Sequence, residues 1–79
     1  MLSASLFLDN LGPGQSGTIK AVGGPAEVRF RLLEMGLTSG TKVRVVRTAP
    51  MGDPLELDVR GYRLSVRKSE ASGVSIGAA

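Results

Sequence analysis

Residues 25–40 read PAEVRFRLLEMGLTSG, and their pattern predicts a short helix over about residues 25–35. Pro25 suits the first position of a helix, because its ring fixes φ near the helical value and its missing N–H would have no partner there. A helix of this length is barely stable in isolation. It must therefore be held by packing, and the rest of the sequence predicts that it packs against a sheet.

One side of this helix is apolar. Val28, Leu32 and Met35 recur at intervals of four and three residues, which places them on one stripe that must be buried. Gly36 can adopt the left-handed conformation that ends many helices. Leu37 follows it, and we expect Leu37 to fold back on Leu32 in a Schellman closure.

The remaining sequence alternates between polar and apolar residues and predicts about five short strands. Segments rich in Gly, Pro, Asp and Ser separate them and are typical of turns. The expected strands cover residues 18–22, 41–49, 55–59, 62–66 and 74–76, and residues 68–72 read as a short turn.

The register of one hairpin can be predicted. Residues 55–66 read LELDVRGYRLSV, and if Arg60 and Gly61 form a two-residue loop, Val59 pairs with Tyr62 and all the apolar side chains share one face. A slip of one residue would turn them toward solvent. A tight primed turn requires a positive φ at Arg60, so a bulge at Gly61 is the alternative.

The composition limits the fold and the chemistry. The chain has 79 residues with no cysteine and no histidine, which predicts a single domain over residues 1–79 with one small core. Disulfides and metal sites built on thiolates or imidazoles are excluded. Several short strands and one helix sharing so small a core favour a mainly β fold that curls into a partly open barrel, with the helix over one opening.

The sequence also predicts where the protein works. No apolar run is long enough to span a membrane. Residues 1–8 lack the basic start and long apolar stretch of a secretory signal. The absence of cysteine fits a reducing compartment, and we expect a cytoplasmic protein.

The titratable residues do not suggest an enzyme. Glu56 and Asp58 share one face of a strand, but Arg63 and Arg67 are available across the hairpin, so a solvated, ion-paired surface is the favoured interpretation. No nucleophile and base occur in a catalytic pattern. We expect no catalytic residue, no cofactor and no metal ligand.

The formal charge of +3 raises the question of nucleic acid. The basic residues are interleaved with acids, and only three aromatic residues are present. We expect at least Tyr62 to belong to the core, which leaves no surface on which bases could stack. Phe30 lies near the edge of the apolar stripe, and we favour a place in the core over the alternative of an exposed anchor for a partner. The sequence therefore argues against nucleic-acid binding. This function stays open as an alternative, because small basic barrels with a glycine turn are common among ribosomal and RNA-binding proteins.

Several motifs, taken in order, resemble the FeoA family, small proteins of bacterial ferrous iron uptake. The resemblance covers about residues 6–76 and rests on order and spacing more than on any single motif. The motifs are LGPGQSG at 11–17, RLLEMGLTSG at 31–40, APMGDP at 49–54 and GYRLSVRKSEA at 61–71.

This resemblance implies an SH3-like barrel and an accessory role in the cytoplasm. Such proteins are thought to act on FeoB, a membrane iron permease with a GTP-binding domain. A similar domain ends the iron-dependent repressors, which connects the family with transition metals. Direct iron binding is not expected here, because the chain lacks histidine and clustered carboxylates.

We therefore expect a regulatory module that binds FeoB through an exposed surface. The favoured surface is the loop at Met51, Gly52 and Asp53 with Arg47 nearby, and the second choice is the helix face at Arg29 and Arg31. A peptide-binding or nucleic-acid-binding SH3-like module related to the repressor domains is the alternative function. The sequence leaves open whether the protein forms a homo-oligomer.

Overall fold

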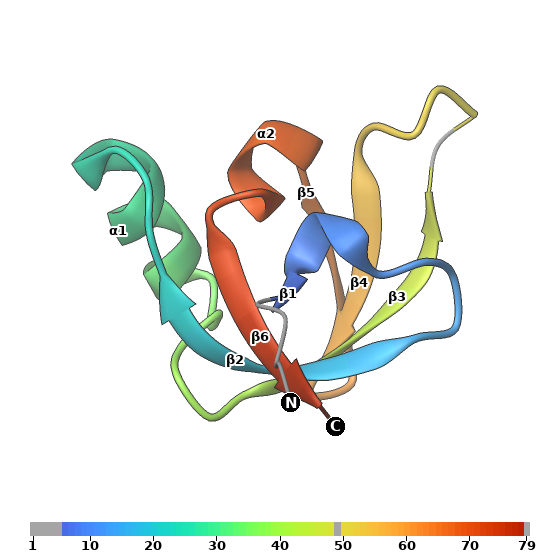
Figure 1. Ribbon diagram of the computed structural model, residues 1–79, viewed down its shortest axis with the longest axis horizontal. Coiled ribbons are helices and arrows are strands. Elements are labelled where there is room, and N and C mark those ends of the chain that lie inside the picture. Colours follow the sequence, from blue (N-terminus) through green and yellow to red (C-terminus); the bar gives the residue numbers. More distant parts are fainter. Residues whose placement is uncertain (1–5, 49, 79) are drawn as a thin grey trace, which may run out of the picture.

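The computed structural model describes residues 6–48 and 50–78 and contains one antiparallel sheet of six strands (Figure 1). The strands follow the spatial order β1-β6-β2-β3-β4-β5. They are β1 (Leu6–Phe7), β2 (Ser16–Val22), β3 (Lys42–Thr48), β4 (Leu55–Val59), β5 (Tyr62–Val66) and β6 (Val74–Ala78). The helices are the 3-10 turn η1 (Leu8–Asn10), α1 (Ala26–Glu34) and the one-turn α2 (Lys68–Ala71).

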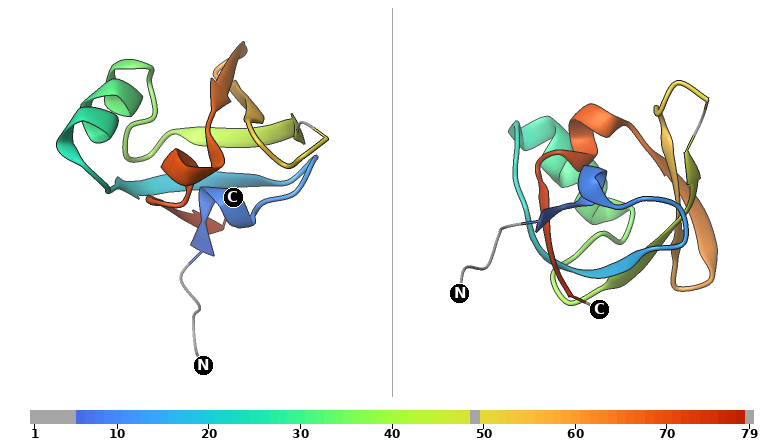
Figure 2. Two further views of the ribbon diagram at one scale, coloured as in Figure 1. Left: turned by 90° about the horizontal axis from the view of Figure 1, so that it is seen from above. Right: turned by 45° about the vertical axis from the view of Figure 1, so that its right-hand side comes forward.

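The sheet is strongly curved and wraps around the core as a partly open barrel (Figures 1 and 2). The strand order leaves β1 and β5 as its two edges. Figure 1 shows α1 at one side of the curved sheet beside β2, with α2 next to it. The described residues form mainly β structure, and α1 is their one helix of more than about a turn. This architecture confirms the predicted fold class.

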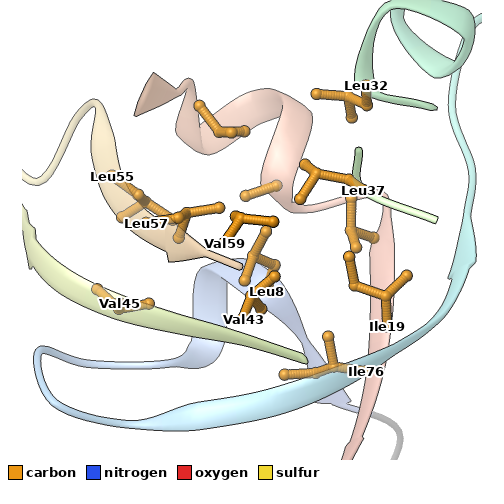
Figure 3. Close-up of a cluster of buried hydrophobic side chains, with 13 residues drawn as sticks. Leu8, Ile19, Leu32, Leu37, Val43, Val45, Leu55, Leu57, Val59 and Ile76 are labelled. Atoms are coloured by element: carbon orange, nitrogen blue, oxygen red, sulfur yellow. The ribbon is translucent and has the colours of Figure 1, made fainter. Parts of the chain in front are cut away.

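The core fills the inside of the curved sheet (Figure 3). Alternation along β3 and β4 buries Val43 and Val45 on one strand and Leu57 on the other, while their polar neighbours face outward. Both α-helices and η1 also contribute. The buried apolar side chains are Leu8, Ile19, Leu32, Leu37, Val43, Val45, Leu55, Leu57, Val59, Val66, Ala71, Val74 and Ile76.

The end of α1 is the predicted Schellman closure. The N–H of Leu37 donates to the carbonyl of Leu32 at 3.0 Å, and the N–H of Gly36 donates to that of Leu33 at 3.0 Å. Gly36 has a φ of +98°, which only glycine adopts without strain. The closure buries both Leu32 and Leu37 completely.

The β4–β5 hairpin has the predicted register. Val59 pairs with Tyr62, Leu57 with Leu64 and Asp58 with Arg63. Arg60 and Gly61 form the two-residue loop with φ values of +51° and +89°, as a type I′ turn requires. The bulge alternative is therefore wrong, and Arg60 carries a left-handed strain of roughly 1–2 kcal/mol.

Two aromatic residues differ from the prediction. Phe30 is 60% exposed, because it lies two residues before the buried Leu32, which places it on the opposite side of a helix with 3.6 residues per turn. Tyr62 is 43% exposed, because it lies on the edge strand β5. Its hydroxyl donates to the carbonyl of Met35 and covers the end of α1.

Other differences concern short elements. The structure adds the two-residue strand β1, which pairs with β6, and forms the helical turn α2 where a simple turn was predicted. The first long strand begins two residues earlier than predicted, at Ser16. Ala49, placed at the end of a predicted strand, lies outside the described residues.

Candidate functional site

The loop between β3 and β4 has an exposed tip and an anchored end. The Met51 side chain is 92% exposed at the tip. Gly52 next to it has a φ of +84°. At the end of the loop, the carboxylate of Asp53 accepts the N–H of Lys68 at 2.9 Å, which ties the loop to the start of α2. The loop therefore presents Met51 from a fixed base.

Glu70 connects the same region to α1. Its side chain is only 10% exposed and forms an ion pair with Arg31 of α1. The other carboxylate oxygen, Oε1, accepts the N–H of Arg67 at 3.1 Å. One largely buried carboxylate thus joins α1 to the first turn of α2, and Arg31 keeps half of its own surface exposed.

These contacts surround a polar pocket of about 320 Å³. The pocket brings together Arg31 from the helix and Asp53 from the loop, which the sequence analysis placed on two separate candidate surfaces. The exposed Arg31, Arg67 and Asp53 can form hydrogen bonds with a partner. Both oxygens of the largely buried Glu70 are already engaged within the protein. The lining residues are Arg31, Asp53, Pro54, Ser65, Arg67 and Glu70.

The other candidate residues do not line this pocket. Arg29 lies over the exposed ring of Phe30, with its guanidinium carbon 5.5 Å from the ring centroid. Arg47 is exposed on β3, where it pairs in register with Glu56 of β4. Met51 and Gly52 belong to the loop that leads into the pocket.

Sequence reasoning missed Ser65, Arg67 and Glu70 as members of the site. A signal for Glu70 was present, since a Glu three residues after the start of a helical turn can accept a backbone N–H there. The ion pair between Arg31 and Glu70 had no such signal, because it joins two helices far apart in the sequence.

The acids of the hairpin form the expected solvated ion pairs, with one change of partner. Glu56 pairs with Arg63 at 3.4 Å, but Asp58 pairs with Arg44 of β3 at 3.5 Å instead of with a residue across the hairpin. Arg44 lies opposite Asp58 in the β3–β4 ladder, which gives it access to that carboxylate. The exposure of both pairs makes them surface interactions of small energy.

The donor atoms do not fit a transition-metal site. Within residues 6–48 and 50–78, no three Asp or Glu residues gather closely enough to hold an ion. The chain offers no imidazole or thiolate. Ferrous iron and zinc prefer such ligands or clustered carboxylates, so the side chains of the described residues suit neither ion.

Among the residues that the structure describes, no helix has the length and the apolar character that crossing a membrane requires.

The curved six-stranded sheet, the helix α1 and the exposed loop between β3 and β4 define a small β-barrel domain. Its candidate binding surface is the pocket beside that loop. The FeoA domain model matches residues 7–77. The chain belongs to the FeoA domain family, which is linked to ferrous iron transport.

A curated relative joins this domain to a transporter. The Fe(2+) transport protein A/Fe(2+) transporter FeoB fusion protein of Porphyromonas gingivalis is 33% identical over 69 residues, which cover 87% of this chain. The chain spans only 8% of the length of that protein.

Solved FeoA structures share the fold. The FeoA-like protein of Clostridium acetobutylicum is 31% identical with a TM-score of 0.87, and the match covers 98% of this chain and 90% of that one. FeoA of Stenotrophomonas maltophilia in complex with zinc, described as a prokaryotic SH3-domain protein, is 30% identical with a TM-score of 0.79 and coverages of 91% and 89%. The predicted SH3-like fold is confirmed.

A repressor provides a likeness of fold alone. A manganese-dependent transcriptional repressor bound to manganese has a TM-score of 0.87 at 11% identity, over 99% of this chain and 38% of the repressor chain. The barrel is therefore shared with a domain of metal-dependent repressors, as the resemblance implied.

Proposed function

We propose that this protein is a cytoplasmic accessory and regulatory protein of ferrous iron uptake that acts by binding the FeoB permease. The fusion relative carries this proposal, because it holds a similar domain and a FeoB transporter in one chain. Covalent linkage raises the effective concentration of two domains that work on each other. Two domains that are not covalently linked must associate through their own surfaces.

The proposed contact surface is the pocket between α1, α2 and the β3–β4 loop, together with the exposed tip of that loop. Arg31 and Arg67 offer guanidinium donors at this surface, and Arg is enriched in protein interfaces. Met51 adds an exposed, flexible apolar side chain that adapts to a partner. The surface thus combines an apolar anchor with oriented polar groups, as binding hot spots do.

Arg47, Gly52 and Asp53 complete this surface around the loop, and Arg29 stacked on Phe30 provides a second contact on the adjoining helix. Phe30 is exposed and backed by a guanidinium group. An exposed aromatic ring such as that of Phe30 can bury most of its surface area against a partner. In this role the protein performs no chemistry of its own and acts by binding.

The test is an NMR titration of the ¹⁵N-labelled protein with the isolated GTP-binding domain of FeoB. We expect shifts in a single patch formed by residues 50–54, α1 and α2. Met51→Ala should weaken binding by about tenfold, the loss of one well-buried hot-spot side chain. The control is Lys20→Ala, which changes an exposed side chain of β2 outside the proposed surface.

Asp53→Ala is not a clean binding variant, because Asp53 also holds the start of α2. The proposal fails if the GTP-binding domain causes no localised shifts. A different result would favour the nucleic-acid alternative. In that case the GTP-binding domain causes no shifts, whereas nucleic acid causes shifts across the basic residues that disappear when salt is added.

A further inference from the structure

A second groove, of about 420 Å³, lies on the outward face of β2, β3 and β4. It lies at the other end of β4 from the pocket lined by Arg31 and Asp53, since Arg60 follows that strand whereas Asp53 precedes it. Its lining residues are Ser16, Lys42, Val43, Arg44, Asp58 and Arg60.

The groove is basic. Lys42, Arg44 and Arg60 contribute three cationic side chains, and Asp58 is the only acid in the lining. Asp58 pairs with Arg44. Among the described carboxylates, none forms an ion pair with Lys42 or Arg60.

Lys42 and Arg60, which form no ion pair with a described carboxylate, are close neighbours. Val43 pairs with Val59 across β3 and β4, which places Lys42 beside Arg60, one step further along the ladder. Neighbouring like charges repel each other across a sheet. This arrangement is more favourable when an anion lies between the two side chains.

Arg60 also occupies a position that its side chain does not favour. Its φ of +51° lies at the first loop position of the type I′ turn, where Asn, Asp or Gly is preferred. The guanidinium Nη2 donates to the hydroxyl of the buried Thr41 at 3.3 Å, which ties the Arg60 side chain to the residue before β3. Strained backbone that holds a side chain in place is common at binding sites.

We propose that this groove binds an extended acidic peptide segment of a partner protein. Lys42 and Arg44 are two residues apart on β3 and face outward together, so their positions repeat at about 6.8 Å. An extended peptide with carboxylates at alternate positions presents them at the same spacing. Arg60 lies beside Lys42 and shares the carboxylate that Lys42 binds, and each contact is a charge-assisted hydrogen bond.

A peptide fits the groove better than single-stranded nucleic acid does. Binding of nucleic acid without sequence preference combines cations with aromatic rings on which bases stack. The exposed aromatic residues Phe30 and Tyr62 do not line this groove. The proposal concerns a surface other than the one proposed for FeoB, and neither depends on the other.

The experiment uses a fluorescein-labelled peptide, Glu-Thr-Glu-Thr-Glu, and measures its affinity for the full chain by fluorescence anisotropy. The double variant Lys42→Gln/Arg60→Asn should bind about tenfold more weakly, as expected for the loss of charge-assisted contacts. The matched control Lys20→Gln removes one exposed lysine outside the groove and should stay within about twofold, because salt screens distant charges.

Folding is checked separately. Asn accepts the left-handed conformation better than Arg does, so the double variant should melt at the same temperature as the wild type or higher. If it does not fold, Lys42→Gln alone replaces it, since this side chain is exposed on β3. Weaker binding with unchanged melting supports the site.

Three results would overturn the proposal. One is equal affinity of the wild type and the variant. Another is equal binding of the neutral peptide Gln-Thr-Gln-Thr-Gln. The last is an oligothymidylate that binds more tightly than the acidic peptide and loses affinity in the same variant.

Discussion

Replacing Gly36 with Ala should destabilise the protein for two separable reasons. The first is conformational, because the φ of Gly36 is +98° and the left-handed region costs an L-residue roughly 1–2 kcal/mol. The second is steric, because a Cβ at this position would collide with the hydroxyl of Tyr62. Moving Tyr62 breaks its hydrogen bond to the carbonyl of Met35, which is worth about 1 kcal/mol.

The expected loss in the free energy of unfolding is therefore about 2–3 kcal/mol. Gly40→Ala is the matched control, since Gly40 has a similar φ of +90° and no atom lies within 4 Å of its added Cβ. The control should lose only the conformational part, about 1–2 kcal/mol. Urea denaturation of both variants measures the difference.

A double-mutant cycle tests the steric part directly. Tyr62→Phe removes the hydroxyl that the new Cβ would meet, and the ring carbon that remains is 3.7 Å away, an ordinary contact. Gly36→Ala should therefore cost about 1 kcal/mol less in the Tyr62→Phe background than in the wild type. Equal losses at Gly36 and Gly40, or zero coupling with Tyr62, would refute the reasoning.

Two further stability predictions concern the core and the loop anchor. Leu57→Ala should cost about 2–5 kcal/mol in urea denaturation, because Leu57 is fully buried on a strand paired on both sides; a loss below about 1 kcal/mol would contradict its place in the core. Asp53→Ala should lower the free energy of unfolding by about 1 kcal/mol, because it removes the side-chain acceptor of a backbone N–H at the start of α2. Asp53→Asn keeps an oxygen for the N–H of Lys68 and should lower the free energy of unfolding clearly less. Equal losses in the two Asp53 variants would show that the hydrogen bond contributes nothing.

The parts of the fold that the sequence predicted correctly are those decided by neighbouring residues. The β4–β5 register follows from two alternating segments and the two-residue loop between them, because a slip would expose every apolar side chain. The end of α1 follows from Gly36 and Leu37 in the same way. These signals need no knowledge of distant contacts.

The parts that could not be predicted depend on contacts between distant segments. The exposure of Phe30 is an exception, because the predicted apolar stripe through Leu32 already places Phe30 on the opposite side of α1. The pocket depends on Arg31 meeting Glu70 and on Asp53 meeting Lys68, and each pair joins segments that only the folded barrel brings together. The loop and the helix face were therefore predicted as two separate surfaces, because the sequence could not show that they adjoin.

The position of β4 bears on how the two proposed surfaces can work. The basic groove reaches Asp58 of β4, and the pocket reaches Ser65 of β5, which pairs with Glu56 of β4. Two steps along the strand, about 7 Å, therefore separate the nearest parts of the two linings. The inward side chains of β4 are buried, which holds that separation fixed. A partner domain seated over the pocket therefore comes close to the near end of the groove, and one protein could contact both surfaces by following only part of β4.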